Sequence, residues 1–383
     1  MTVTAPKGFR AAGVAAGIKE NGNKDLTLVV NDGPLDVAAG VFTRNKVKAA
    51  PVLWSQQVLS TGRVKAVVLN SGGANACTGP EGFQDTHKTA EHVAATLGIG
   101  AVDVAVCSTG LIGARLPMDN LTAGVTQAAA QLDATPEAGL AAAEAVMTTD
   151  TVPKQAQTSG NGWTIGGFAK GAGMCAPNMA TMLSVLTTDA VLDQEQADAA
   201  LKAAVSRTFN TLDVDGGTST NDTVLLLCSG ASGQTPEDFT QKLTEVCHDL
   251  VKQLQADAEG VTKHITITVT GAATDEEAKQ AATVIAQDNL CKTAFFGSDP
   301  NWGRVAMAVG NAPTEFDQNK LDITINGIEV CRNGAAGEDR DKADLTGRDI
   351  TVEVNLNAGP GAATVLTTDL SHGYVEENSA YSS

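Results

Sequence analysis

Strand-like and helix-like segments alternate along the 383 residues of this chain. Alternation of apolar and polar residues predicts strands over residues 265–270, 322–325 and 350–356. Helical spacing of apolar residues predicts helices over residues 236–258 and 275–287. This interspersion indicates an α/β or α+β protein, although the pattern alone does not choose a topology.

Local signals add further boundaries. Asn326 and Gly327 lie between two alternating segments and predict a hairpin turn. Asp193 is a candidate N-cap for a helix over residues 194–209. The alanine-rich stretch 128–147, broken near Pro136, predicts a helix. Short apolar runs in the first half, each followed by a polar or glycine-rich turn, mark candidate strands at residues 26–30, 64–69 and 102–106.

Composition bounds the class of protein. A hydrophobic content of 43% is enough for a sizeable core in one large domain or two closely packed ones. The formal charge of −18, from 44 acidic and 26 basic residues, argues against nucleic acid and anionic membranes as partners. No apolar run approaches the roughly 18 residues of a membrane helix, and the first residues lack a signal-peptide layout. The seven cysteines are odd in number and form no CxxC, so we expect reduced thiols and a cytoplasmic protein.

The segment from Lys170 to Leu183, KGAGMCAPNMATML, carries the strongest chemical signal. It places Thr181 after the small residue Ala180 and at the head of an apolar run. A threonine hydroxyl is a poor nucleophile without a base, but an N-terminal threonine has its own α-amine, with an unperturbed pKa of roughly 7.7–8.0. The sequence therefore suggests a chain that cuts itself between Ala180 and Thr181, through attack of the hydroxyl on the preceding carbonyl. Without the surrounding motif, Thr181 would read as an ordinary strand residue.

This segment resembles the self-cleavage site of the glutamate N-acetyltransferases, also called ornithine acetyltransferases, of the cyclic arginine pathway. The resemblance runs nearly end to end. Further matching stretches are APKGF (5–9), AAGIK (15–19), VFTRN (41–45), NACTG (75–79), STGLIG (108–113), MTTDT (147–151), STNDT (219–223), AEGVTK (258–263), FGSDPNWGR (296–304) and YVEENSAYSS (374–383). The chain departs from the family pattern at Gly73, at Gly217 and at Cys175-Ala176.

The resemblance implies a fold and a processing event. We expect stacked β-layers flanked by helices, in an arrangement like that of N-terminal-nucleophile enzymes, with Thr181 heading a strand. Cleavage would give one chain of residues 1–180 and a second of residues 181–383, which fold as one intertwined globular body and stay associated. The family suggests a heterotetramer with two copies of each chain.

The resemblance also implies site residues. Thr181 is the expected nucleophile, and Thr109 and Gly110 the expected oxyanion hole, although from the sequence alone an ordinary strand-to-helix turn is an equal reading of that segment. The expected substrate-binding residues are Thr148, Lys170, Thr181, Glu259, Asn378 and Ser383. Lys170 would meet a substrate carboxylate and Glu259 the side-chain ammonium of ornithine. A solvated charge is the default reading of either residue taken singly.

A metal site is not expected. Asp213, Asp215, Asn221 and Asp222 lack the spacing of a calcium loop, and His87 and His92 are five positions apart rather than four. A structural or hydrogen-bonding role is the better reading of these side chains.

Together these features predict transfer of acetyl from N²-acetylornithine to glutamate through an acetyl-threonine, with no metal or organic cofactor. Acetyl-CoA is a possible second acetyl donor. An N-terminal-nucleophile amidohydrolase or aminopeptidase is the alternative, because the threonine chemistry is identical and only the acceptor differs. A catalytically silent binding protein with Thr181 as a plain strand residue is the third reading.

Overall fold

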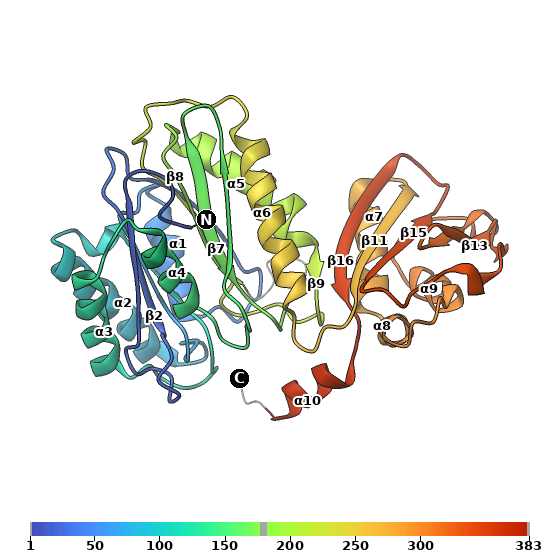
Figure 1. The fold of residues 1–383 in the computed structure, drawn as a ribbon, viewed down its shortest axis with the longest axis horizontal. Coiled ribbons are helices and arrows are strands. Elements are labelled where there is room, and N and C mark those ends of the chain that lie inside the picture. The colour runs from blue at the N-terminus through green and yellow to red at the C-terminus, as the bar shows by residue number, and fades with distance from the viewer. Residues whose placement is uncertain (1, 177–181, 381–383) are drawn as a thin grey trace.

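The computed structural model describes residues 2–176 and 182–380. They form a large lobe (residues 2–176 and 182–256) and a small lobe (residues 264–370), joined at one end (Figure 1). The helix α10 (His372–Ala380) leaves the small lobe and runs back toward the large one. None of the helices in the described parts of the chain is long and apolar enough to cross a membrane.

The large lobe contains two sheets. The first has the order β1 (Phe9–Val14), β2 (Leu26–Asn31), β4 (Ala66–Asn70), β5 (Val104–Ser108). The second has the order β3 (Val37–Phe42), β10 (Thr223–Cys228), β8 (Leu183–Thr188), β7 (Thr164–Lys170), β6 (Lys154–Ser159). The inner strands are buried along their whole length, as expected of strands covered on both faces. Antiparallel pairing sets Lys170 opposite Leu183, so the end of β7 and the start of β8 lie next to each other in the sheet.

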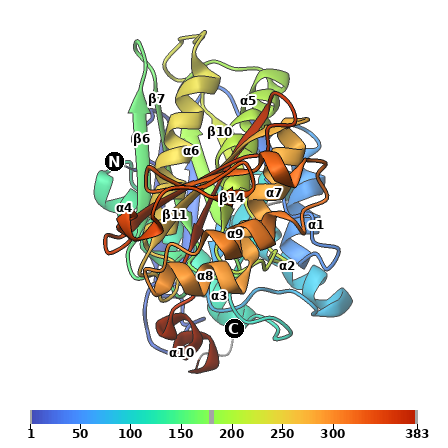
Figure 2. The same cartoon turned by 90° about the vertical axis from the view of Figure 1, so that its right-hand side faces the viewer.

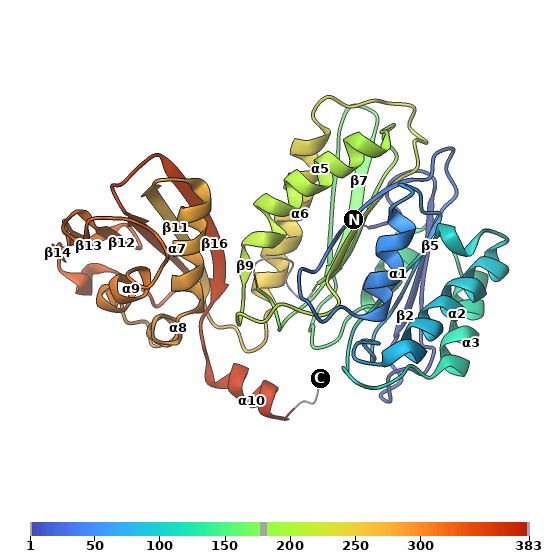
Figure 3. The ribbon, with the colours of Figure 1, turned by 180° about the vertical axis from the view of Figure 1, so that it is seen from behind.

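Helices alternate with these sheets in layers. Helices α2 (Gly79–Leu97) and α3 (Met118–Ala130) cover the outer face of the first sheet, and α5 (Gln194–Arg207) and α6 (Phe239–Ala256) cover the outer face of the second (Figures 1 and 3). Helices α1 (Ala50–Leu59) and α4 (Pro136–Ala145) contact strands of both sheets and lie between them. One apolar cluster covers both faces of the first sheet, reaching α2 and α3 on its outer face and the second sheet on its inner face. A second cluster fills the space between the second sheet and α5 and α6.

The small lobe is a third sheet covered on one face, seen from the side in Figure 2. Its order is β14 (Ala335–Ala336), β13 (Ile328–Arg332), β12 (Asp322–Ile325), β15 (Asp349–Asn355), β11 (His264–Ala272), β16 (Gly361–Thr368), β9 (Leu212–Asp213). Helices α7 (Asp275–Gln287), α8 (Asn289–Phe296) and α9 (Trp302–Val309) pack on the buried face. Because β9 comes from the large lobe and pairs with β16, the third sheet itself links the two lobes.

The predicted class, β-layers flanked by helices, is confirmed. The strands at 265–270, 322–325 and 350–356 and the helices at 236–258 and 275–287 appear with shifts of at most three residues at an end. Asn326 and Gly327, both with positive φ, form the predicted turn between β12 and β13. Asp193 caps α5 with a full capping box.

The structure sharpens two predicted boundaries. The helical stretch 128–147 is interrupted near Pro136 as predicted, since α3 ends at Ala130 and α4 begins at Pro136, where Thr135 accepts the capping hydrogen bond and proline suits the first helical position. The run 102–106 becomes a strand only from Val104 onward, since residues 101–103 form a 3₁₀ turn.

Candidate active site

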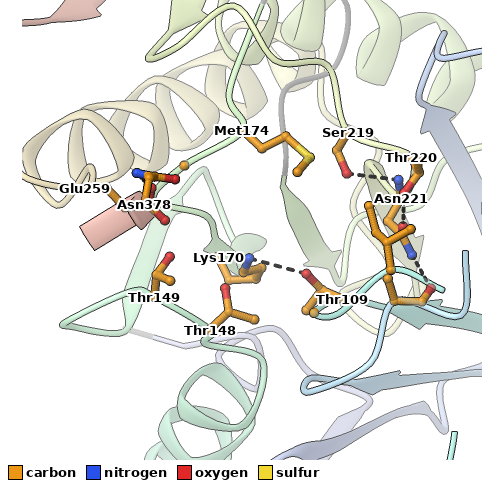
Figure 4. Close-up of a pocket in the computed structure, with 14 residues that line it drawn as sticks. Thr109, Thr148, Thr149, Lys170, Met174, Ser219, Thr220, Asn221, Glu259 and Asn378 are labelled. Atoms are coloured by element: carbon orange, nitrogen blue, oxygen red, sulfur yellow. Dashed lines mark hydrogen bonds between the residues drawn. The ribbon is translucent and has the colours of Figure 1, made fainter. Parts of the chain in front are cut away.

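A pocket opens at the strand ends of the second sheet, where β7 ends and β8 begins (Figure 4). Its walls come from segments far apart in the sequence. The lining residues are Ala74, Thr109, Gly110, Ile112, Thr148, Thr149, Lys170, Gly173, Met174, Ser219, Thr220, Asn221, Glu259 and Asn378.

Six of the predicted site residues lie in this one pocket: Thr109, Gly110, Thr148, Lys170, Glu259 and Asn378. The remaining predicted residues, Ala180, Thr181 and Ser383, lie outside the described residues. Met182, which follows Thr181 in the sequence, is buried just before β8.

The turn after β5 supplies hydrogen-bond donors on one side of the pocket. The N–H of Thr109 is already used, donating to the carbonyl of Asn70 at 3.0 Å. The N–H of Gly110 has no acceptor among the described residues. Gly110 has φ of +124°, and a Cβ there would lie 2.6 Å from the backbone of Gly72, so only glycine fits.

The hydroxyl of Thr109 is also available. It accepts from Lys170 Nζ at 3.4 Å, which leaves its own hydrogen to be donated. The Thr109 hydroxyl and the Gly110 N–H therefore form a pair of donors at one turn, the arrangement that stabilises a developing oxyanion.

A buried chain of charges lies behind this side of the pocket. Lys170 is 2% exposed, and its Nζ lies 4.0 Å from Asp150 Oδ2. Asp150 also accepts from Lys154 Nζ at 2.6 Å and from the N–H groups of Gly171 at 2.7 Å and Thr148 at 3.0 Å. Burial alone would raise the pKa of Asp150, but the charges of Lys170 and Lys154 outweigh it and hold the pKa at about 2. Asp150 is therefore ionised at neutral pH and balances the charge of Lys170.

The opposite side of the pocket is built from the loop after α6 and from α10. Asn378 Nδ2 donates to Glu259 Oε2 at 2.8 Å. The Glu259 carboxylate packs against Gly173, where an added Cβ would come within 2.2 Å of a carboxylate oxygen. Asp257, two residues before Glu259, pairs with Lys154, so the buried charges continue from Asp150 to this loop.

Comparison with known proteins identifies the family. The model of the ArgJ family matches residues 10–383. The chain belongs to the ArgJ family. The chain is 61% identical to the arginine biosynthesis bifunctional protein ArgJ of Mycolicibacterium paratuberculosis, over 100% of this chain and 96% of that one. It is 60% identical to the protein of the same name from Thermobifida fusca, over 100% of both chains.

A solved structure also matches in part. The structure of ornithine acetyltransferase complexed with ornithine, from Mycobacterium tuberculosis, is 62% identical, covers 48% of this chain and 96% of that chain, and has a TM-score of 0.46. The family inferred from the sequence motifs is thus confirmed by the ArgJ family match and the ArgJ relatives.

The acidic residues considered as metal ligands have hydrogen-bonding roles in this ArgJ-family chain. Asp215 accepts from the N–H groups of Met174 at 2.6 Å and Cys175 at 2.9 Å and from Tyr374 Oη at 3.2 Å. Asp213 accepts from Gln287 Nε2 at 2.7 Å. Within residues 2–176 and 182–380, no group of three or more His, Cys, Asp or Glu side chains is placed to hold a metal ion.

Sequence reasoning missed two residues that organise this ArgJ-family site. Asp150 lies inside the MTTDT stretch, and Asn221 lies inside STNDT, but neither was singled out as part of the site. Asp150 reaches Lys170 and Gly171, and Asn221 reaches carbonyls distant in the sequence, so a motif could flag the stretch but not the role.

Proposed function

We propose that this chain is a self-cleaved glutamate N-acetyltransferase, which moves an acetyl group from N²-acetylornithine to glutamate. The observation that carries the proposal is the convergence of Thr109, Gly110, Thr148, Lys170, Glu259 and Asn378 on one pocket. Family membership favours this transferase over the amidohydrolase alternative.

The first half-reaction loads the enzyme. The α-amine of Thr181, freed by cleavage, takes the proton of the Thr181 hydroxyl, which forms a bond to the acetyl carbonyl carbon. Thr109 Oγ1 and the N–H of Gly110 stabilise the oxyanion. The oxyanion then collapses, the amide C–N bond breaks, and the proton passes to the departing α-amine of ornithine. The product is acetyl-Thr181.

The second half-reaction reverses these steps with a different amine. The α-amine of glutamate attacks acetyl-Thr181, the same donors hold the oxyanion, and the Thr181 hydroxyl leaves with its proton restored. Lys170 would meet a carboxylate of either substrate, and Glu259 the side-chain ammonium of ornithine. Because a covalent intermediate divides the reaction, no metal or organic cofactor is required.

The two chains produced by cleavage would stay together. The pairing of β7 with β8 joins residues from both sides of Ala180–Thr181 in one sheet, which supports an assembly that survives the cut. The family suggests two copies of each chain. Six buried cysteines and an exposed Cys77 suit a reducing, cytoplasmic compartment.

The decisive test compares Thr181→Ala with Thr181→Ser. The wild type should give two masses that sum to the chain plus one water, one of them starting at Thr181, and it should transfer acetyl. Thr181→Ala should give one uncut, inactive chain, whereas Thr181→Ser keeps a hydroxyl and should still cleave. Acetyl transfer by Thr181→Ala would overturn the proposal.

Two further assays fix the reaction type. Acetate released from acetylornithine, undiminished by glutamate, would favour the amidohydrolase. Acetylglutamate formed from acetyl-CoA and glutamate without acetylornithine would establish the second activity that the name of the bifunctional relatives suggests.

A further inference from the structure

The stretch Ser219–Asp222 lies against the pocket, and its last two side chains reach in different directions. Asn221 contacts the turn that carries Thr109 and Gly110, whereas Asp222 contacts the chain next to Thr181. Neither residue has a part in the reaction proposed above.

Asn221 holds the turn after β5. Its Nδ2 donates to the carbonyls of Ala74 at 2.6 Å and Ser108 at 2.8 Å. The Thr220 hydroxyl donates to Asn221 Oδ1 at 2.6 Å, which fixes the amide so that its N–H groups face the two carbonyls. Figure 4 shows Thr220 and Asn221 side by side at the pocket wall.

This contact fixes the position of the oxyanion donors. The peptide unit between Ser108 and Thr109 is held at both ends, because its carbonyl accepts from Asn221 and its N–H donates to Asn70. The next groups along the chain are the Thr109 side chain and the Gly110 N–H. Their position therefore depends on where Asn221 places the preceding peptide.

Asp222 holds the start of β8. It is fully buried, and its Oδ1 accepts from the N–H of Met182 at 2.9 Å. The carbonyl of Met182 accepts from the N–H of Thr223 at 3.0 Å. The residue bonded to Thr181 is thus fixed at both of its backbone groups by Asp222 and Thr223.

Burial raises the pKa of the Asp222 carboxyl well above its usual value, against the opposing influence of the Met182 N–H and the charge of Lys170. Asp222 accepts from Met182 through one oxygen, Oδ1, and the amide oxygen of an asparagine could take the same place.

We infer that Asn221 and Asp222 form a positioning pair that sets the separation between the oxyanion donors and Met182, the residue bonded to the proposed nucleophile. The inference rests on the proposed function. Asn221 holds the peptide that precedes the oxyanion donors, and its neighbour Asp222 holds Met182, so a change at either residue alters the distance between these two groups. Both residues act through others, and neither needs to touch substrate.

Near-isosteric substitutions test the pair. Asn221→Asp keeps the shape but replaces the amide donor to Ala74 and Ser108 by a carboxylate oxygen, and we expect kcat to fall about a hundredfold with KM for acetylornithine little changed. Asp222→Ala leaves the Met182 N–H without its acceptor and should slow self-cleavage about tenfold or more. Asp222→Asn keeps an acceptor and should restore most of that loss.

Asn31→Asp is the matched control. Asn31 is also buried, and its Nδ2 also donates to two carbonyls, those of Leu35 at 3.0 Å and Cys228 at 3.4 Å, at the other end of β10. The Asn31→Asp variant should lower the unfolding temperature about as much as Asn221→Asp does, but it should leave the rate of self-cleavage and kcat unchanged. Equal losses of kcat in both variants would reduce Asn221 to a structural residue and overturn the inference.

The outcomes separate this inference from the proposed function. A wild type that neither cleaves nor transfers acetyl contradicts the proposed function itself. An active wild type with a fully active Asn221→Asp variant contradicts only the pair. If Asn221→Asp does not fold, the ratio of cleavage rates between Asp222→Asn and Asp222→Ala decides, and a ratio near one overturns the inference.

Discussion

The two sides of the pocket are built differently. Thr109, Lys170 and Asn221 on the inner side are each no more than 5% exposed and are held by buried partners. Glu259 and Asn378 on the outer side are partly exposed and come from a loop and the last described helix. The inner side presents hydrogen-bond donors suited to an oxyanion, whereas the outer side presents charge and amide groups suited to recognising a substrate.

The difference shows how the chain distributes rigidity. Groups that must stabilise charge developing in a transition state gain from fixed geometry, because they need not reorganise during the reaction. Groups that admit and release substrates must be reachable from solvent. The inner side fixes its groups through ion pairs and hydrogen bonds that water does not reach, so substitutions there should cost most.

Removing Asp150 should have the largest effect. Asp150→Ala leaves Lys154 with one carboxylate partner and Lys170 with none of the acidic partners found in the described chain, so we expect unfolding to become easier by about 3–5 kcal/mol. Lys202→Ala breaks an exposed ion pair with Asp198 and should change the free energy of unfolding by less than about 1 kcal/mol. Denaturant unfolding measures both, and equal small changes would mean that the inner charges do not stabilise the fold.

Removing the Thr109 hydroxyl should have the second largest effect. Thr109→Val keeps the shape and loses one oxyanion donor, so kcat per cleaved chain should fall about 10²–10³-fold, or about 3–4 kcal/mol. Lys170 keeps its contact with Asp150, so the fold should persist. Normal kcat with raised KM would assign Thr109 to substrate binding and remove the chemical distinction between the two sides.

Lowering the pH should reduce the stability that Asp150 on the inner side gives to the fold, over a defined pH range. The pKa of Asp150 in the folded chain is about 2, below its usual 3.8, so its ionisation stabilises the fold above pH 4, and that contribution is lost as the pH falls toward 2. At about 1.4 kcal/mol per pKa unit, the loss is about 2 kcal/mol. The difference in unfolding free energy between wild type and Asp150→Asn should shrink by that amount between pH 6 and pH 2. A constant difference would contradict the depressed pKa.

The sequence predicted the fold where local rules act. The turn at Asn326 and Gly327 and the cap at Asp193 were predictable because each depends on a few adjacent residues. The first half was harder, because α1 lies between two sheets and its buried face is not set apart by a polar one.

The site divides in the same way. Motifs brought Thr109, Lys170 and Glu259 into one hypothesis, and all three line the pocket. A lysine taken alone reads as solvated, yet Lys154 is fully buried because Asp150 and Asp257 meet it from two sides. The pair of Lys154 with Asp257 joins segments 103 residues apart, and no local pattern records it.

The smallest effect should come from the outer side. Asn378→Ala removes one partly exposed hydrogen bond to Glu259, so we expect KM for acetylornithine to rise by up to about tenfold, or about 1 kcal/mol, with kcat and the unfolding temperature unchanged. Ser379→Ala is the control, since Ser379 is the next residue of α10 and does not line the pocket. Steady-state kinetics with acetylornithine as the varied substrate distinguishes the two. A fall in kcat as large as that of Thr109→Val would place Asn378 among the groups that carry the chemistry, and the contrast between a rigid inner side and an accessible outer side would fail.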